Sequence, residues 1–152
     1  MTKVKIYTKS ILIPVILGGI VGIFISSSID YNSVQKPFLS PPSMVFPIIW
    51  TILYILMGIS KGILQSKSLV DKDINIIYYV QLFVNLLWPV AFFILKWRLF
   101  AFIWICLLAV LVLYMIIKFY SKDKLAGLLQ IPYFIWTVFA AYLNLFVYLL
   151  NK

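Results

Sequence analysis

Long stretches that are almost free of charge constrain this chain more than any other feature. Five of them have the length and composition of helices, and we predict these helices at Ser10–Ile29, Pro42–Leu64, Ile74–Leu95, Leu99–Ile117 and Leu125–Asn151. About twenty apolar residues at roughly 1.5 Å each cross a hydrocarbon core of about 30 Å, and the longest stretch can span with tilt. The sequence therefore predicts an all-α fold, an integral membrane bundle of five transmembrane helices, as one domain over residues 1–152.

The overall composition agrees with a membrane protein. Of the 152 residues, 64% are hydrophobic and 11% are charged, and a soluble chain of this size could not bury so much apolar surface. The net charge of +9 would suggest nucleic acid in a soluble protein. Here the Lys and Arg residues lie mainly between the apolar stretches, where they fit membrane topology and lipid headgroups better. We expect the bilayer, and not nucleic acid, as a partner.

The sequence lacks the residues that several kinds of catalytic and metal-binding site require. The chain has no histidine, which excludes a Ser–His triad, a His-ligated zinc and a proximal haem histidine, and we expect no metal and no cofactor. The four acids, Asp30, Asp71, Asp73 and Asp123, all fall outside the apolar stretches. A buried carboxylate relay is therefore missing, which disfavours a transporter.

The distribution of Lys and Arg predicts the orientation. One side of the membrane would hold nine of them: Lys3, Lys5, Lys9, Lys61, Lys67, Lys72, Lys118, Lys122 and Lys124. The other would hold four: Lys36, Lys96, Arg98 and Lys152. The positive-inside rule then predicts a multi-pass protein with a cytoplasmic N-terminus. A second interpretation of the first stretch is a cleaved signal peptide, with a basic start and small residues at its end.

Three of the predicted helices each carry an aromatic face with a few polar groups. Helical spacing puts Trp50 and Tyr54 on one face of the second helix, and Gln81, Asn85 and Trp88 on one face of the third. The fifth helix carries a stripe of Pro132, Tyr133, Trp136, Phe139, Ala140, Leu143 and Asn144. An apolar cavity lined by rings would suit a flat, hydrophobic ligand. The alternative is that the rings pack on one another. The two amides must point into the bundle, as interhelical hydrogen bonds or as ligand contacts.

Several motifs in order resemble the TspO/MBR family, the tryptophan-rich sensory proteins related to the mitochondrial translocator protein or peripheral-type benzodiazepine receptor. They are Tyr31 with Lys36-Pro37, Pro41-Pro42, the run Phe46-Pro47-Ile48-Ile49-Trp50-Thr51-Ile52-Leu53-Tyr54 with Met57-Gly58, Gln81-Leu82 with Asn85 and Trp88, and Pro132-Tyr133 with Trp136 and Phe139-Ala140-Ala141-Tyr142-Leu143-Asn144. The resemblance covers most of the chain, from the first loop to the last helix.

The resemblance implies a five-helix bundle in a bacterial cell membrane, commonly a homodimer. It implies binding of porphyrins such as protoporphyrin IX, of sterols in some members, and of isoquinoline-carboxamide and benzodiazepine drugs. By position, the ligand site would comprise Tyr31, Trp50, Tyr54, Asn85, Trp88, Cys106, Trp136, Phe139, Ala140 and Leu143. The tryptophans that match Trp50 and Trp136 are tied in some relatives to light- and oxygen-dependent porphyrin degradation, an alternative function in which these two residues would be catalytic.

The sequence departs from the family pattern at three places. Asp30 replaces an aromatic residue before Tyr31, and Phe38-Leu39 follows Lys36-Pro37, so the resemblance does not establish whether the first loop contacts a ligand. Ile105 stands where many relatives have an acid in the fourth helix. Leu145, Tyr148 and Lys152 fit the loose sterol-binding pattern, but Leu111, Tyr114 and Lys118 fit it equally well, so the pattern does not establish sterol binding.

Overall fold

A computed structural model describes residues 2–29 and 33–152 of the chain. Within this part, five helical stretches are long and apolar enough to cross a membrane: Lys3–Ser28, Val45–Ser66, Lys72–Ile94, Arg98–Lys122 and Lys124–Asn151. The described residues contain no strand. The prediction of an all-α bundle with five membrane-spanning segments is therefore confirmed.

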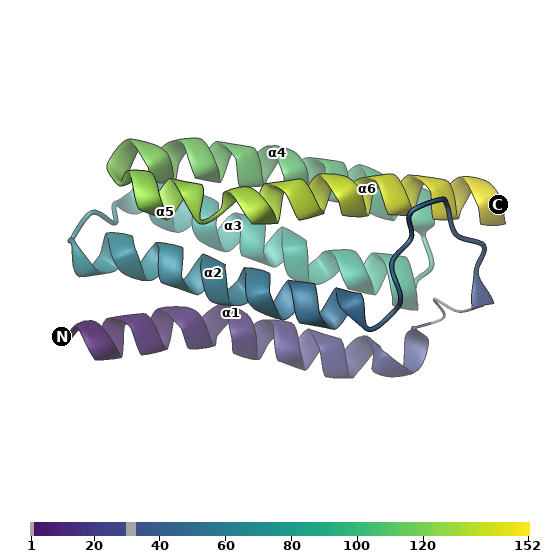
Figure 1. Cartoon of the computed structure of the whole chain (residues 1–152), viewed down its shortest axis with the longest axis horizontal. Helices are drawn as coiled ribbons and strands as arrows, with labels where there is room; N and C mark the ends of the chain where they lie inside the picture. The colour runs from purple at the N-terminus through teal and green to yellow at the C-terminus, as the bar shows by residue number, and fades with distance from the viewer. Residues whose placement is uncertain (1, 30–32) are drawn as a thin grey trace.

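The helices lie side by side along one long axis, with the N-terminus and the C-terminus at opposite ends (Figure 1). Helix α1 (Lys3–Ile25) lies against α2 (Val45–Ser66), while α4 (Arg98–Lys122) packs against both α3 (Lys72–Pro89) and α6 (Ile131–Asn151). Large aliphatic side chains at the outer surface of the bundle, such as Val110 and Ile135, are more than 60% exposed. Such a surface suits lipid as the surrounding solvent.

Several helices begin at other residues than predicted, because local hydrogen bonds at their N-termini determine where they start. Helix α1 begins seven residues early, at Lys3, where the hydroxyl oxygen of Thr2 accepts a hydrogen bond from the Lys5 N–H at 3.3 Å. Helix α3 begins at Lys72, capped by the Asp71 carboxylate, which accepts from the Ile74 N–H at 2.9 Å. Helix α2 begins only at Val45, because the chain first makes a turn in which the Val45 N–H donates to the carbonyl of Pro42.

The predicted single helix Leu125–Asn151 is wrong, since the structure divides it into α5 (Lys124–Leu128) and α6. A turn at Leu129 and Gln130 separates them. Pro132 lies in the first turn of α6 and has no N–H to donate to the carbonyl four residues earlier, so an α-helix cannot run through this point with all its hydrogen bonds. Together the two helices still make one membrane-spanning segment.

Pro89 has a comparable effect at the end of α3. After it the chain continues as the π-helical stretch η3 (Val90–Ile94). The sequence predicts a kink at this place, and the structure has a change of helix type there. The turn Leu95–Trp97 follows, with Lys96 in the left-handed region at φ 55°.

Glycines allow α1 and α2 to approach closely. A Cβ added at Gly58 would lie 2.6 Å from the carbonyl oxygen of Ser10 and nearer still to the Cα of Ile11. Gly62 faces the ring of Tyr7, and Gly18 faces the ring of Tyr54. These contacts fix α1 on the side of α2 and shape one wall beside the aromatic residues of α2.

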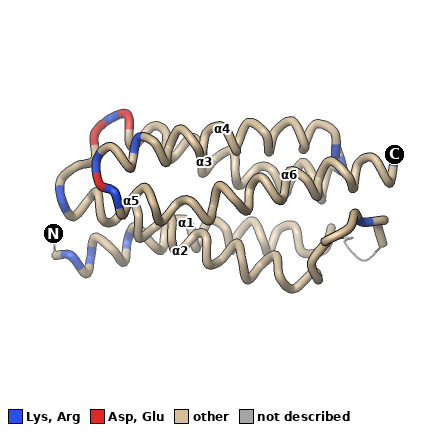
Figure 2. Tube along the Cα trace, turned by 45° about the horizontal axis from the view of Figure 1, so that its top comes forward, with Lys and Arg blue, Asp and Glu red and all other residues tan. Residues whose placement is uncertain are grey.

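The charged residues gather at the end of the bundle that holds the N-terminus, where Figure 2 shows most of the blue and red segments. Two ion pairs join the α2–α3 loop to the α4–α5 junction: Lys67 with Asp123 at 2.6 Å, and Lys122 with Asp71 at 2.9 Å. The Lys122 and Lys67 ammonium groups lower the pKa of Asp71 and Asp123, respectively, with help from backbone N–H groups. This end is thus held together by paired charges.

Candidate functional site

Aromatic side chains of α2 and α6 meet between these two helices. The ring of Trp50 lies 6.0 Å from that of Tyr54 and 6.3 Å from that of Tyr133. The ring of Trp136 lies 5.8 Å from that of Phe46, across the gap to α2, and 5.3 Å from that of Phe139. Each tryptophan thus belongs to a set of rings that joins α2 to α6. We call the two sets together the aromatic cluster: Phe46, Trp50, Tyr54, Tyr133, Trp136 and Phe139.

A chain of buried hydrogen bonds underlies this aromatic cluster and joins three helices. The Tyr54 hydroxyl donates to the side-chain oxygen of Asn85 at 2.6 Å, and the Asn85 amide donates to the Tyr133 hydroxyl at 2.7 Å. Tyr133 in turn donates to the side-chain oxygen of Gln81 at 2.7 Å, and the Gln81 amide donates to the backbone carbonyl of Tyr78 at 2.8 Å. Both amides thus act as interhelical bonds, the first of the two roles that the sequence left open.

Trp88 belongs to a second polar connection, which joins it to Asn144 and to the start of α4. Its indole N–H donates to the side-chain oxygen of Asn144 at 2.9 Å, and the Asn144 amide donates to the backbone carbonyl of Arg98 at 2.8 Å. The indole ring also stacks on Phe92, with 5.1 Å between the ring centres. Trp88 therefore ties α3 to α6 and to the start of α4.

The indole nitrogen of Trp136 differs from that of Trp88. It is buried, yet among the described residues no acceptor lies within hydrogen-bond distance of it. A buried donor without a partner costs on the order of 1–3 kcal/mol. Because Phe46 and Phe139 flank this indole, the unused donor lies within an apolar, aromatic environment.

The first loop is hydrogen-bonded to the C-terminal half of α6. The Tyr142 hydroxyl donates to the carbonyl of Phe38 at 2.6 Å, and the Asn151 side chain exchanges two hydrogen bonds with the backbone of Gln35, at 3.0 and 2.8 Å. Figure 1 shows this segment crossing from α2 to the end of α6. Tyr31, which the sequence assigns to the same loop, lies outside the described residues.

The other predicted site residues lie on α6 and α4. Ala140 and Leu143 are buried on α6, and Ala140 belongs to the main hydrophobic core against which Trp50, Trp88 and Trp136 pack. Cys106 is a half-buried free thiol on α4, next to the fully buried Ile105. A ligand-binding role for these residues, and a cavity between Trp50 and Trp136, stay predictions.

Sequence reasoning left Tyr133 and Phe46 out of the predicted site. Tyr133 connects Asn85 with Gln81, and Phe46 is the residue through which α2 contacts Trp136. A signal for both was present: Tyr133 precedes Trp136 by three residues on the same helical face, and Phe46 precedes Trp50 by four.

Comparisons with known proteins identify the family. The family model described as TspO/MBR family matches residues 10–149. The chain is 36% identical to Tryptophan-rich protein TspO of Archaeoglobus fulgidus, an alignment covering 93% of this chain and 94% of that protein. It is 34% identical to Protein CrtK of Rhodobacter capsulatus, over 88% and 85% of the two chains, and 30% identical to Translocator protein of Sus scrofa, over 80% and 75%. The chain is a multi-pass membrane protein that belongs to the TspO/MBR family.

Proposed function

We propose that this protein binds and senses flat, hydrophobic molecules within the membrane, above all porphyrins such as protoporphyrin IX. Isoquinoline-carboxamide and benzodiazepine drugs would use the same site. Family membership supports this proposal, and the observation that carries it is the buried Trp136 indole N–H without an acceptor, set among aromatic rings of α2 and α6.

The chemistry of the aromatic cluster fits such a ligand. When a planar macrocycle binds, the aromatic side chains would stack on its two faces and no longer on one another, so little packing energy would be lost. A carboxylate or carbonyl oxygen on the ligand would accept the free Trp136 N–H and so remove the penalty for a buried, unpaired donor. The hydrogen bonds among Tyr54, Asn85 and Tyr133 would meanwhile hold the surrounding helices in place.

The test is a protoporphyrin IX titration of purified protein, followed by the absorption of the bound porphyrin. Trp136→Phe keeps an aromatic ring and removes the N–H, so we expect the dissociation constant to rise roughly tenfold. Trp97→Phe is the matched control, because Trp97 is 57% exposed on the turn before α4, and it should leave the affinity unchanged. Equal dissociation constants for both variants would argue against this site.

A second candidate function is porphyrin degradation under light and oxygen. The ring of Trp50 contacts that of Tyr133, which precedes Trp136 by three residues on α6, and Trp136 contacts Phe46 of α2, so both tryptophans lie between α2 and α6. Illumination of the bound porphyrin would distinguish the two functions. Bleaching faster than that of free porphyrin in detergent, and lost in Trp50→Phe or Trp136→Phe, would indicate turnover, whereas bleaching at the free rate would indicate binding alone.

We also propose that the protein works as a homodimer in a bacterial cell membrane with its N-terminus in the cytoplasm. Family membership supports the dimer, and the distribution of Lys and Arg supports the orientation. Light scattering on the purified protein, corrected for bound detergent, would give the mass of two chains if the dimer is right and of one chain if it is wrong.

A further inference from the structure

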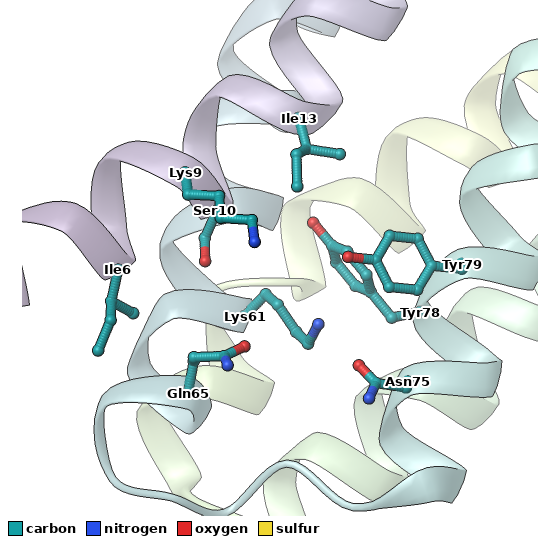
Figure 3. A pocket seen from close by; sticks show the side chains of 9 residues that line it. All are labelled: Ile6, Lys9, Ser10, Ile13, Lys61, Gln65, Asn75, Tyr78 and Tyr79. Carbon is teal, nitrogen blue, oxygen red and sulfur yellow. The ribbon is translucent and has the colours of Figure 1, made fainter. Parts of the chain in front are cut away.

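A hollow of about 430 Å³ lies between α1, α2 and α3 toward the charged end of the bundle, and none of the residues that line it belongs to the aromatic cluster. Figure 3 shows the side chains that line it, with the amino groups of Lys9 and Lys61 both directed into the space between the three helices. The other polar groups around it are Ser10, Gln65, Asn75, Tyr78 and Tyr79. Two cations and five polar side chains thus surround one space, and among the described residues no carboxylate lines it.

Lys61 is the unusual residue of this hollow. It is only 4% exposed, although it belongs to a membrane-spanning segment, where a buried charge needs a partner. None of the described carboxylates, Asp71, Asp73 and Asp123, pairs with it. Its ammonium group instead lies 4.7 Å and 4.9 Å from the ring centres of Tyr78 and Tyr79. Two cation–π contacts satisfy the charge in part, and they leave it without a counter-anion.

The Tyr78 hydroxyl is a second unsatisfied group. Tyr78 is 1% exposed, lines the same hollow, and has no hydrogen-bond partner for its hydroxyl among the described residues. A buried hydroxyl and a buried ammonium group beside one space offer hydrogen bonds to an anion with several oxygen acceptors. A phosphate group has this chemistry.

An apolar groove on α1 adjoins the hollow. It has a volume of about 590 Å³ and is lined by Val4, Lys5, Thr8, Lys9, Leu12, Ile13, Ile16 and Leu17, so it shares Lys9 and Ile13 with the hollow. From Lys9, which lines both spaces, to Leu17 the helix rises by about 12 Å, which is enough for the first part of an acyl chain. An extended acyl chain could therefore lie along α1 while its headgroup occupies the hollow.

We propose that the hollow between Lys9, Lys61 and Tyr78 binds the phosphate of an anionic phospholipid, whose acyl chain lies in the groove along α1. The charge complementarity of the two lysines selects a lipid with a net negative charge over a zwitterionic one. The lipid supplies the counter-anion that Lys61 lacks. Because it contacts α1, α2 and α3 together, it also holds α1 on the bundle at this end.

Native mass spectrometry of the purified full chain tests the proposal, with phosphatidylglycerol and phosphatidylcholine of identical acyl chains added in separate titrations. The unchanged protein should bind phosphatidylglycerol roughly tenfold more tightly. Lys61→Met keeps the length and removes the charge, and it should abolish this preference. Lys72→Met is the matched control, because Lys72 is an exposed lysine at the same end that lines neither the hollow nor the groove. It should keep the preference.

Two further measurements make the result decisive. Lys9→Met changes an exposed residue and leaves Lys61 in place, so it should reduce the preference even if Lys61→Met folds poorly. Inorganic phosphate at the concentration of the lipid should displace no lipid. Equal lipid preference in Lys61→Met and Lys72→Met would overturn the proposal. Binding of inorganic phosphate without any preference for the anionic lipid would overturn it too, since the site would then take a soluble anion.

Discussion

At the scale of single residues, the most consequential feature is that Asn85 uses both ends of its amide. Its oxygen accepts from Tyr54 and its nitrogen donates to Tyr133, so one side chain joins α2 and α6 to α3. Asn85 is 3% exposed, and water cannot replace either bond. Removing this amide therefore deprives the Tyr54 and Tyr133 hydroxyls of one hydrogen bond each, inside the buried part of the bundle.

We expect Asn85→Ala to lower the free energy of unfolding by about 1–3 kcal/mol, because buried groups lose their hydrogen bonds. Asn75→Ala is the control, since Asn75 is an exposed amide on the same helix. It should change the stability by no more than about 0.5 kcal/mol. Thermal unfolding in one detergent, followed by tryptophan fluorescence, measures both. Equal losses would mean that the hydrogen-bond chain contributes no stability.

The sequence predicted which residues face inward but not which groups they bind. Gln81 and Asn85 were expected inside the bundle because unsatisfied amides are costly in lipid, and both are buried. The cost of an unsatisfied amide in lipid indicates which face of a single helix is buried, and it contains no information about the neighbouring helices. The Tyr133 partner depends on the rotation and height of α6 relative to α3, which no local pattern encodes. For the same reason, the sequence could not indicate that Trp136 keeps a free N–H while Trp88 does not.

At the scale of helices, Gly58 decides how closely α1 approaches α2. A valine there would place its Cβ against the backbone of Ser10 and Ile11, which cannot move aside as a side chain can. We expect Gly58→Val to destabilise the protein by about 1–3 kcal/mol. Gly22→Val is the control, because a Cβ at Gly22 meets no described atom within 4 Å. Unfolding in mixed detergent micelles compares the two, and an equal effect would contradict close packing at Gly58.

The existence of the helices was predictable and their ends were not. Five apolar stretches of sufficient length leave few alternatives in a bilayer, and all five spans are present in the described residues. Their ends depend on single hydrogen bonds, such as those that Thr2 and Asp71 accept at the starts of α1 and α3. The turn before α6 could have been predicted from Pro132, since a proline that starts a helix also ends the one before it.

Charge pairs connect helices at the N-terminal end, and their strength depends on pH. Asp71 and Asp123 have a lowered pKa in the folded protein, so their stabilising contribution is complete above the ordinary aspartate pKa of about 4 and is lost as the pH falls through the lowered values. We expect the unfolding temperature to be level from about pH 5 to 7 and to fall below about pH 4. A double variant, Asp71→Asn with Asp123→Asn, should lack this part of the decline. If the unfolding temperature of the double variant fell by the same amount at low pH, groups other than Asp71 and Asp123 would be responsible for the fall.

At the scale of the whole molecule, the two ends differ in charge. The N-terminal end carries nine Lys residues between and beside the helices, against four Lys and Arg residues at the other end, and an odd number of spans puts the termini on opposite sides of the membrane. The membrane potential and the anionic inner leaflet both retain Lys and Arg in the cytoplasm. The charged end, the hollow that contains Lys61 and the two ion pairs would then face the cytoplasm.

Labelling of single cysteines in intact bacterial cells tests this orientation without altering the Lys and Arg count. In a Cys106→Ala background, Phe38→Cys places a thiol on the first loop, where Phe38 is 82% exposed, and Ser121→Cys places one at the exposed end of α4. A membrane-impermeant thiol reagent should label Phe38→Cys in intact cells and should reach Ser121→Cys only after permeabilisation. The reverse pattern would put the N-terminus outside. Labelling of both variants in intact cells would mean that the charge difference does not fix the orientation, because chains would then insert both ways.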